Sequence, residues 1–386
     1  MQGEHTADDA GPSAAHGLGG ESLRAVYRDL LRFGPRSRRD LTLRLGLSAP
    51  TVTRITRELL GAGHLRPLEP VARSKGRPQE PLDIQENQGP RFIGVKVTAD
   101  EIHAVVTTVR GNALEELVLP LAATDPESVE AAVAEPVLAL AEAHPDVAGI
   151  GVSLGGRVAA RRRVVSSTML GWQEPHDLAD RLERRLGLPV AVDNDLAAMV
   201  HGLHWFGIGR AYGSFAVLTI GAGVALGAVI GGRLVTGHHH LAGVTELLPV
   251  GADADGRALT LGEAARTDRV LRRAQEHGVL EPAQGMERLR EKLAAGDPGA
   301  LDVAAAVSRA LARATAAVVA LIDPEAIVLG GETLDLVRAA SPVFEQTLHD
   351  AIAPAQQDLV VRELSGEFDE WARGAAVLAI QQFVGP

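Results

Sequence analysis

From residue 91 onward, short apolar runs alternate with amphipathic helical segments, and this alternation restricts the fold more than any other feature. The apolar runs have the length of buried strands, and each is followed by polar turns or a helical periodicity. We expect strands at 92–97, 102–109, 147–153, 190–192, 214–220, 224–230 and 326–329, and helices at 126–144, 176–186 and from 196 onward. The pattern predicts an α/β body of two lobes that divide between residues 190 and 205, without a tandem repeat.

The segment before this body has a different character. Apolar residues at helical spacing predict a helix from Ser22 to Phe33; Ser22 is expected to cap it, and Gly34 and Pro35 end it. Ser37 is expected to cap a second helix, and Ser48 a third that continues to Leu60.

A hairpin is expected to follow these helices, over residues 64–84. Three short helices followed by a hairpin form the winged helix-turn-helix plan. We therefore divide the chain into a disordered tail (1–20), a winged helix-turn-helix domain (21–85) and a body (90–386).

Charge is distributed unevenly between these parts. Residues 22–78 contain thirteen basic and four acidic residues, a net charge of +9, and the remainder of the chain carries −20. A basic module on an acidic body indicates a polyanion as partner of the module alone, although a solvated arginine-rich surface has the same composition.

The third helix and the hairpin tip are the expected contacts to double-stranded DNA. The inward face of the helix is expected to comprise Val52, Ile55, Leu59 and Leu60, so the opposite face is expected in the major groove. Arginines there reach guanine edges or phosphates, and small residues allow a close approach. The candidates are Ser48, Ala49, Thr51, Thr53, Arg54 and Arg57. At the wing, Lys75, Gly76 and Arg77 are expected at a narrow minor groove, although an ordinary basic turn has the same sequence.

Several functional classes are excluded or disfavoured by what the sequence lacks. There is no cysteine, which excludes disulfides and thiolate zinc sites. The first twenty residues lack the basic start and apolar core of a signal peptide. The longest apolar run that we identify, 215–230, is interrupted by glycines and indicates strand, turn and strand rather than a membrane span. We expect a cytoplasmic, nucleoid-associated protein.

Short motifs recur in a fixed order along the chain after residue 20. They are Leu47-Ser48-Ala49-Pro50-Thr51-Val52-Thr53, Gly76-Arg77-Pro78, Gly151-Val152-Ser153-Leu154-Gly155-Gly156, Gly171-Trp172, Leu188-Pro189-Val190, Asp193-Asn194-Asp195, Leu241-Ala242-Gly243 and Asp323 to Gly331. In this order the chain resembles transcriptional regulators of the ROK family, which comprises repressors and sugar kinases. The resemblance implies a two-lobed, actin-like (ribonuclease H-like) sugar-kinase body.

The sequence departs from the family pattern where kinases hold ATP. Their Asp-x-Gly-x-Thr loop corresponds here to residues 96–100, where Lys, Thr and Asp stand at the three key positions. An added carboxylate repels phosphate. The second phosphate loop, Gly221 to Ala225, keeps two of three expected glycines. We therefore expect no kinase activity and no cofactor.

The sugar and zinc sites of the family are also changed. Met169 and Val244 stand where an Asn and a Glu are usual, Leu247 stands where zinc-binding relatives have a His, and residues 255–262 have none of the expected cysteines. His238 and His240 share a face if the segment is extended, but two ligands do not complete a zinc site. No metal is expected.

Four residues remain as candidates for binding a sugar-like effector: Gly156, Asn194, Asp195 and Glu246. The resemblance implies that Asp195 matches the general base of the kinases. Asp193, Asn194 and Asp195 also precede the helix expected from Leu196, where they can satisfy its free N–H groups, and the capping and ligand-binding roles are compatible. Glu246 is a candidate replacement for the Glu lost at Val244.

The sequence thus predicts a DNA-binding regulator that controls sugar-related genes, binds its operator as a homodimer or dimer of dimers, and responds to a carbohydrate-type effector held between the two lobes. Two alternatives remain open. One is an active sugar kinase with an appended DNA-binding module, and the other is a DNA-binding dimer that needs no ligand.

Overall fold

The computed structural model describes residues 18–70, 79–253, 255–364 and 369–385, which form two compact units. Unit 1 comprises the chain up to Asp193 together with Ala372 to the C-terminus, and unit 2 comprises Asn194 to Trp371. The chain therefore crosses between the units twice. Each unit contains one five-stranded sheet covered by helices, so the α/β class predicted from the sequence is confirmed.

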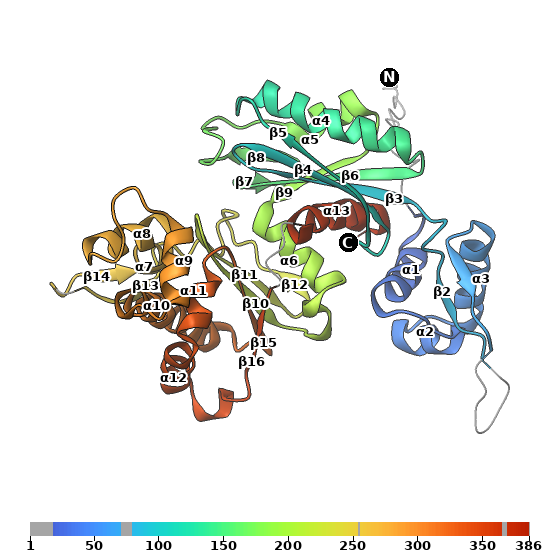
Figure 1. The fold of residues 1–386 in the computed structure, drawn as a ribbon. Helices are drawn as coiled ribbons and strands as arrows, with labels where there is room; N and C mark the ends of the chain where they lie inside the picture. Colours follow the sequence, from blue (N-terminus) through green and yellow to red (C-terminus); the bar gives the residue numbers. More distant parts are fainter. Residues whose placement is uncertain (1–17, 71–78, 254, 365–368, 386) are drawn as a thin grey trace, which may run out of the picture. The chain divides into compact units, whose positions relative to one another are not determined.

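The N-terminal part of unit 1 consists of three helices and a two-stranded antiparallel hairpin (Figure 1). The elements are α1 (Glu21–Phe33), α2 (Arg38–Leu45), α3 (Ala49–Gly61), β1 (Leu65–Pro67) and β2 (Leu82–Ile84). We refer to residues 21–85 as the module.

Local sequence sets the helix starts in the module. Ser37 and Asp40 form a reciprocal capping box at α2, and the Ser48 side chain accepts a hydrogen bond from the backbone N–H of Thr51 at α3. The prediction for α1 was wrong by one residue, because the helix begins at Glu21. Gly20 occupies the capping position of α1 and has no side chain with which to cap it.

The three helices meet in a small apolar core. Its members are fully or almost fully buried: Val26, Tyr27, Leu30, Leu41, Val52, Ile55 and Leu59. The face of α3 predicted to point inward is therefore confirmed at three positions, while Leu60 is only half-buried. Leu43 of α2 is largely exposed.

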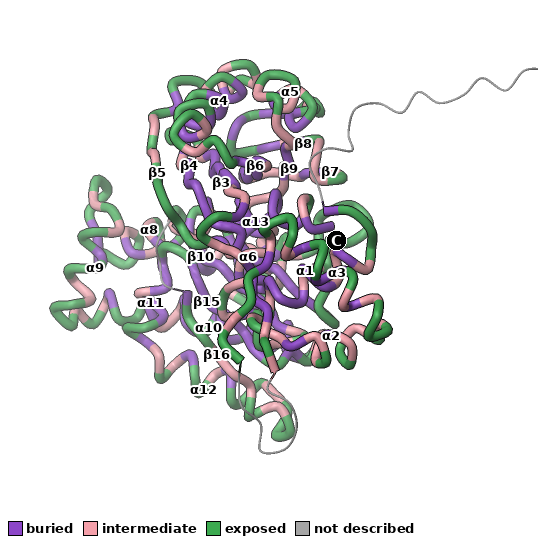
Figure 2. Tube along the Cα trace, turned by 90° about the vertical axis from the view of Figure 1, so that its right-hand side faces the viewer, coloured by how far each residue is buried: buried purple, intermediate pink, exposed green. Residues whose placement is uncertain are grey.

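The sheet of unit 1 has the strand order β5-β4-β3-β6-β9. The strands are β3 (Arg91–Val97), β4 (Glu101–Thr108), β5 (Ala113–Pro120), β6 (Val147–Leu154) and β9 (Val190–Asn194). β3, β4 and β5 are antiparallel neighbours, whereas β3 and β6 run parallel. The central strands are buried and the edge strand β5 is mostly exposed (Figure 2).

Helices cover both faces of this sheet. One face is packed by α4 (Pro126–Ala143) and α5 (Leu178–Leu186), and a small hairpin, β7 (Arg157–Ala159) with β8 (Arg163–Ser166), lies beside α5. The other face carries α13 (Asp369–Val384), the last helix of the chain, as Figure 1 shows. A Cβ on Gly94 would lie 2.0 Å from the carbonyl oxygen of Ala372, and one on Gly151 would lie 1.7 Å from that of Ala375. These two glycines let α13 approach the strands closely.

Unit 2 repeats the same strand order with new elements. Its sheet is β12-β11-β10-β15-β16, which in chain order is again third, second, first, fourth, fifth. The strands are β10 (Phe215–Ile220), β11 (Val224–Ile230), β12 (Arg233–Leu234), β15 (Ala326–Gly330) and β16 (Val360–Glu363). The first three are antiparallel and the last two join in parallel, so the two sheets share one topology although the sequence shows no tandem repeat.

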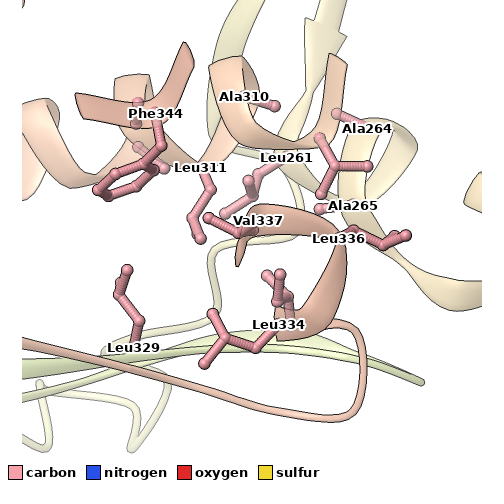
Figure 3. Close-up of a cluster of buried hydrophobic side chains, with 14 of the residues drawn as sticks. Leu261, Ala264, Ala265, Ala310, Leu311, Leu329, Leu334, Leu336, Val337 and Phe344 are labelled. Atoms are coloured by element: carbon pink, nitrogen blue, oxygen red, sulfur yellow. The ribbon is translucent and has the colours of Figure 1, made fainter. Parts of the chain in front are cut away.

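Helix α6 (Asp195–Trp205) packs on one face of the second sheet, and the larger core lies on the other face. In that core, apolar side chains of α7 (Leu261–Ala265), α10 (Pro298–Ile322), α11 (Leu334–Ala339) and α12 (Ser341–Ala351) gather above β15 (Figure 3). The remaining elements are the 3₁₀ turns η1 (Ile208–Ala211) and η2 (Pro354–Gln356), β13 (Pro249–Ala252), β14 (Ala258–Thr260), α8 (Thr267–Glu276) and α9 (Met286–Ala294).

Helix α10 (Pro298–Ile322) is longer than the apolar run at 215–230. Its 25 residues have a mean hydropathy of 1.6 in the most apolar window, which by length and composition alone is enough to cross a membrane. However, 56% of that window is buried inside unit 2, and Val303, Val307 and Leu311 belong to the core. The helix is therefore explained as the central core helix of this unit.

Candidate nucleic-acid interface and ligand-binding residues

The outer face of α3 presents two exposed arginines. Arg54 and Arg57 are both exposed, and the Arg54 side chain, 69% exposed, forms a 3.5 Å ion pair with Glu58 one turn later. An exposed pair of this kind contributes little to stability, so it does not hold Arg54 away from another anion. The face therefore combines two long cationic side chains with the N-terminus of a helix.

The hydroxyl groups predicted on this face are partly used by the helix itself. The Ser48 and Thr51 hydroxyls lie 2.8 Å apart within the cap, and the Thr53 hydroxyl donates to the carbonyl of Ala49 at 2.8 Å. These three hydroxyl groups belong to short side chains and bond to the first turn of α3, so they leave room for a close approach to this end of the helix. Ala49 is exposed at the same end of the helix. Lys75, Gly76 and Arg77 lie outside the described residues.

Other arginines of the module have structural partners that the sequence did not reveal. The Asp29 carboxylate is buried and pairs with Arg44 at 3.0 Å and Arg36 at 3.6 Å. Arg38 donates to the hydroxyl of Thr56 at 3.0 Å, which joins α2 to α3. Part of the positive charge of the module therefore stabilises the module itself.

At the start of α6, Asn194 and Asp195 both bond to the helix N-terminus. The Asn194 side chain accepts from the N–H of Ala197 at 3.2 Å, and Asp195 Oδ1 accepts from the N–H of Leu196 at 2.8 Å. Asn194 is therefore the N-cap, and α6 begins at Asp195, one residue earlier than expected. The preceding Asp193, in unit 1, forms a 3.5 Å ion pair with Arg161, whose pKa is lowered by burial while Asp193 acts in the opposite direction.

Gly156 follows β6 in a crowded position. A Cβ there would lie 2.7 Å from the carbonyl oxygen of Ser166, so only glycine fits. Ser167 is fully buried and its hydroxyl donates to the Gly155 carbonyl at 2.5 Å. The Gly-Gly motif therefore has a packing reason that is independent of any ligand.

The Trp of the Gly-Trp motif is a structural residue. The Trp172 indole N–H donates to the Thr124 carbonyl at 2.6 Å, and the ring packs edge-on against His176 at 5.4 Å. His176 in turn lies 2.6 Å from the buried carboxylate of Glu130 on α4. This arrangement ties the segment after β8 to α4.

The turn that corresponds to the first phosphate loop is closed by its own side chain. The Thr98 hydroxyl receives the N–H groups of Glu101 at 2.9 Å and Asp100 at 3.4 Å, and it donates to Asp100 and to the Glu101 carbonyl. A phosphate-binding loop needs free backbone N–H groups. Two such groups are already occupied here, and a carboxylate lies beside them.

Carboxylates also flank the second glycine turn, in unit 2. A Cβ on Gly221 would lie 3.4 Å from Oε2 of Glu332, and one on Gly223 would lie 4.0 Å from Oε1 of Glu246. Glu246 is paired with Arg266 at 3.4 Å, so its charge is partly compensated. No sequence motif marks Glu332, which reaches this turn from the segment after β15.

The segment that corresponds to the zinc site of relatives includes Leu247 and residues 255–262, with Val244 and the histidines at 238–240 just before it. Leu247 and Val244 are 80% and 62% exposed, and the rings of His238 and His239 stack edge-on at 4.5 Å. In the part of the chain that the structure describes, no three His, Asp or Glu side chains lie close enough together to hold a metal ion.

Comparison with known proteins gives the family. The model of the ROK family matches residues 92–382, which is most of the chain and all of the two-lobed body. This chain belongs to the ROK family.

Relatives of this ROK protein include both enzymes and regulators. A glucokinase of Streptomyces coelicolor is 30% identical over 264 residues, 63% of this chain and 82% of that protein. The DNA-binding transcriptional repressor Mlc of Escherichia coli K12 is 24% identical over 364 residues, 86% of each chain. A solved ROK family transcriptional regulator, described as a homolog of E. coli Mlc, superimposes with a TM-score of 0.79 at 25% identity, over 94% of this chain and 95% of that one. The predicted winged helix-turn-helix with a sugar-kinase-like body is confirmed.

Proposed function

We propose that this ROK protein is a transcriptional regulator that binds double-stranded DNA through α3 and has no sugar kinase activity. The observation that carries the proposal is the position of the module. It precedes the family body, which begins at residue 92, and it presents Arg54 and Arg57 on a capped helix. The match to the repressor extends over 86% of the chain, whereas the match to the glucokinase extends over 63%.

The two altered glycine turns support the absence of phosphoryl transfer. Transfer from ATP depends on positioning and on stabilising negative charge with N–H groups and cations. Here Thr98 occupies N–H groups at one turn, and Glu332 lies against Gly221 at the other. The carboxylate of Asp100 lies at the first turn and that of Glu332 at the second, and each opposes phosphate binding by like-charge repulsion.

We further propose that a sugar or a sugar derivative is the effector, with Gly156, Asn194, Asp195 and Glu246 as contacts. Homodimers, or dimers of dimers, would read palindromic operators, because two-fold proteins match two-fold sites. The setting we propose is cytoplasmic and nucleoid-associated, with sugar-related genes as targets. An effector changes operator affinity only if it binds two states of the protein unequally.

The proposal is tested by selecting bound fragments from a genomic DNA pool with the full-length protein. We expect one recurring palindromic motif. Arg54→Ala should weaken binding to it by about 1–3 kcal/mol and relax the preference at one base position. Arg288→Ala, at an exposed ion pair on α9, serves as the control and should leave affinity unchanged. Failure of the wild type to bind any duplex at moderate salt would overturn the proposal.

An active kinase with an added DNA-binding module is the second candidate. It is favoured by the retained Asp195 and by the glucokinase relative. A coupled assay of ATP turnover with a panel of hexoses separates the two, since we expect no turnover. Thermal shifts with the same panel separate a ligand-responsive regulator from a DNA-binding dimer that needs no ligand: stabilisation by at least one sugar is expected.

A further inference from the structure

One arginine of the first lobe crosses into the module. Arg110 lies in the turn between β4 and β5 and donates to Oδ1 of Asp83 at 2.6 Å, at the end of the wing hairpin. The same guanidinium donates to the carbonyl of Leu30 at 3.2 Å and to that of Leu31 at 3.5 Å. One side chain of the body thus holds both the last turn of α1 and the second strand of the wing.

The chemistry of these acceptors favours a guanidinium. Leu30 and Leu31 belong to the C-terminal turn of α1, where the helix dipole is negative, and the Leu30 carbonyl also accepts the N–H of Gly34 at 3.0 Å. Asp83 is 5% exposed, and a buried carboxylate requires a cationic or hydrogen-bonding partner. Only a planar fork of donors reaches a carboxylate and two carbonyls together.

The turn that carries Arg110 is itself fixed from two sides. The Glu86 carboxylate, in the segment that joins module and body, accepts from the hydroxyl of Thr108 at 2.7 Å and from the amide of Asn112 at 2.5 Å. On the other side, Arg373 of α13 donates to the Gly111 carbonyl at 2.9 Å. Arg373 is the second residue after the point where the chain passes from unit 2 into unit 1.

The far end of α13 contacts the module as well. The Phe383 ring packs edge-on against His64 at 6.4 Å, and Arg28 of α1 donates to the carbonyl of Gly385 at 3.3 Å. The module is therefore held at several points, and Arg110 joins α1 to the second strand of the wing.

We propose that Arg110 is a positioning residue for DNA binding: it fixes the orientation of the recognition helix relative to the body and thereby sets the spacing between half-sites that a pair of modules accepts. The inference rests on the proposed function. Arg110 does not touch DNA in this account, and it acts through Asp83 and the end of α1. Arg373, by holding the turn, supports the same orientation from the start of α13.

The first test measures affinity for a single half-site and for full operators whose half-site spacing is changed by one and two base pairs. Arg110→Ala should keep the affinity for a single half-site within about threefold of the wild type, because the recognition helix is intact. The ratio of its affinities for the preferred and the altered spacings should fall by at least about tenfold. Arg110→Lys keeps the charge but not the planar fork of donors, so its preference for one spacing should lie between that of the wild type and that of Arg110→Ala. Arg66→Ala is the matched control: Arg66 pairs with the same Asp83 at 3.5 Å from within the module, so spacing preference should stay as in the wild type.

The second test is independent of DNA and uses hydrogen exchange of the backbone amides of residues 82–91. Arg110→Ala should speed their exchange by about tenfold, while Arg66→Ala should not. Unchanged spacing preference together with unchanged exchange would overturn the inference, and so would an equal effect of Arg66→Ala. If the wild type binds no duplex, the proposed function fails, but the exchange comparison still decides whether Arg110 fixes the module.

Discussion

At the residue scale, Asn194 is the N-cap of α6 and Asp195 is its first residue. Their different hydrogen bonds allow capping to be tested separately from ligand binding. The Asn194 side chain completes the cap through the N–H of Ala197, whereas Asp195 bonds to the adjacent Leu196. Asn194→Ala should lower stability by about 0.5–2 kcal/mol, because the cap acceptor is lost. Asp195→Asn keeps an oxygen acceptor and should leave stability nearly unchanged while it removes effector binding.

Denaturation midpoints and effector titrations of the two variants provide the comparison. A large loss of stability in Asp195→Asn would assign that residue to the fold and not to the ligand. Unchanged effector affinity in the same variant would remove Asp195 from the proposed contacts.

His64 gives the module a dependence on pH. It packs edge-on against Tyr27 at 5.8 Å and against Phe383, and burial lowers its pKa below the ordinary value of 6.5. Burial also raises the pKa of Tyr27, so this hydroxyl stays neutral. The folded state therefore favours neutral His64, and the unfolded state binds a proton first as the pH falls. Stability from this group is present above pH 6.5 and is lost as the pH drops below it.

Thermal unfolding between about pH 7.5 and pH 5.5 measures this effect. The wild type should lose more stability over that range than His64→Gln, which cannot protonate. An equal loss in both proteins would show that other groups govern the pH dependence.

At the scale of elements, the placement of α13 on the first sheet depends on glycine at two strand positions. Gly151→Ala would put a Cβ 1.7 Å from the Ala375 carbonyl oxygen, so helix or strand must move, and we expect a loss of at least about 3 kcal/mol. Gly149→Ala, in the same strand, is the matched control. Its Cβ would meet Ala379 at 3.5 Å, an ordinary contact, so the cost should be small. Urea unfolding followed by far-ultraviolet circular dichroism tests both, and similar midpoints would contradict this account of the packing.

The elements also show what the sequence was able to predict. Helix α3 and its Ser48 cap were predictable because the signals are local, and the buried strands β3, β6 and β10 were predictable from continuous apolar runs. The edge strand β5 was missed, since it is paired on one side only and carries exposed charges such as Glu115 and Glu116. The return of α13 to the first sheet was missed because it depends on packing against residues more than 200 positions earlier.

The candidate site follows the same rule. Arg54 and Arg57 were identified from helical spacing alone, since exposure on one helix is a local property. Glu332 beside Gly221, and Arg110 beside Asp83, are brought together by the fold from distant positions, so no sequence motif marked them. Ser22 was taken for a cap because its type is right, but the helix starts one residue earlier.

At the scale of the whole molecule, residues 22–78, which make up most of the module, carry a net charge of +9, and the remainder of the chain carries −20. The DNA binding that we propose is therefore expected to depend on local charge, because the total charge of −11 repels a polyanion. Charges beyond about 8 Å are largely screened at physiological salt, so only basic residues at the interface should release counterions. The slope of log affinity against log salt is negative, and Arg57→Ala should reduce its magnitude by about 1, which corresponds to the loss of one phosphate contact.

Glu135→Gln is the control, because it changes the net charge by one unit, in the opposite sense to Arg57→Ala, at an exposed position of α4 on the face of the first sheet opposite α13. Its slope should match that of the wild type over about 50–200 mM salt. If Glu135→Gln altered the slope as much as Arg57→Ala did, the field of the entire chain would govern binding, and the local contact that we assign to α3 would lose its support.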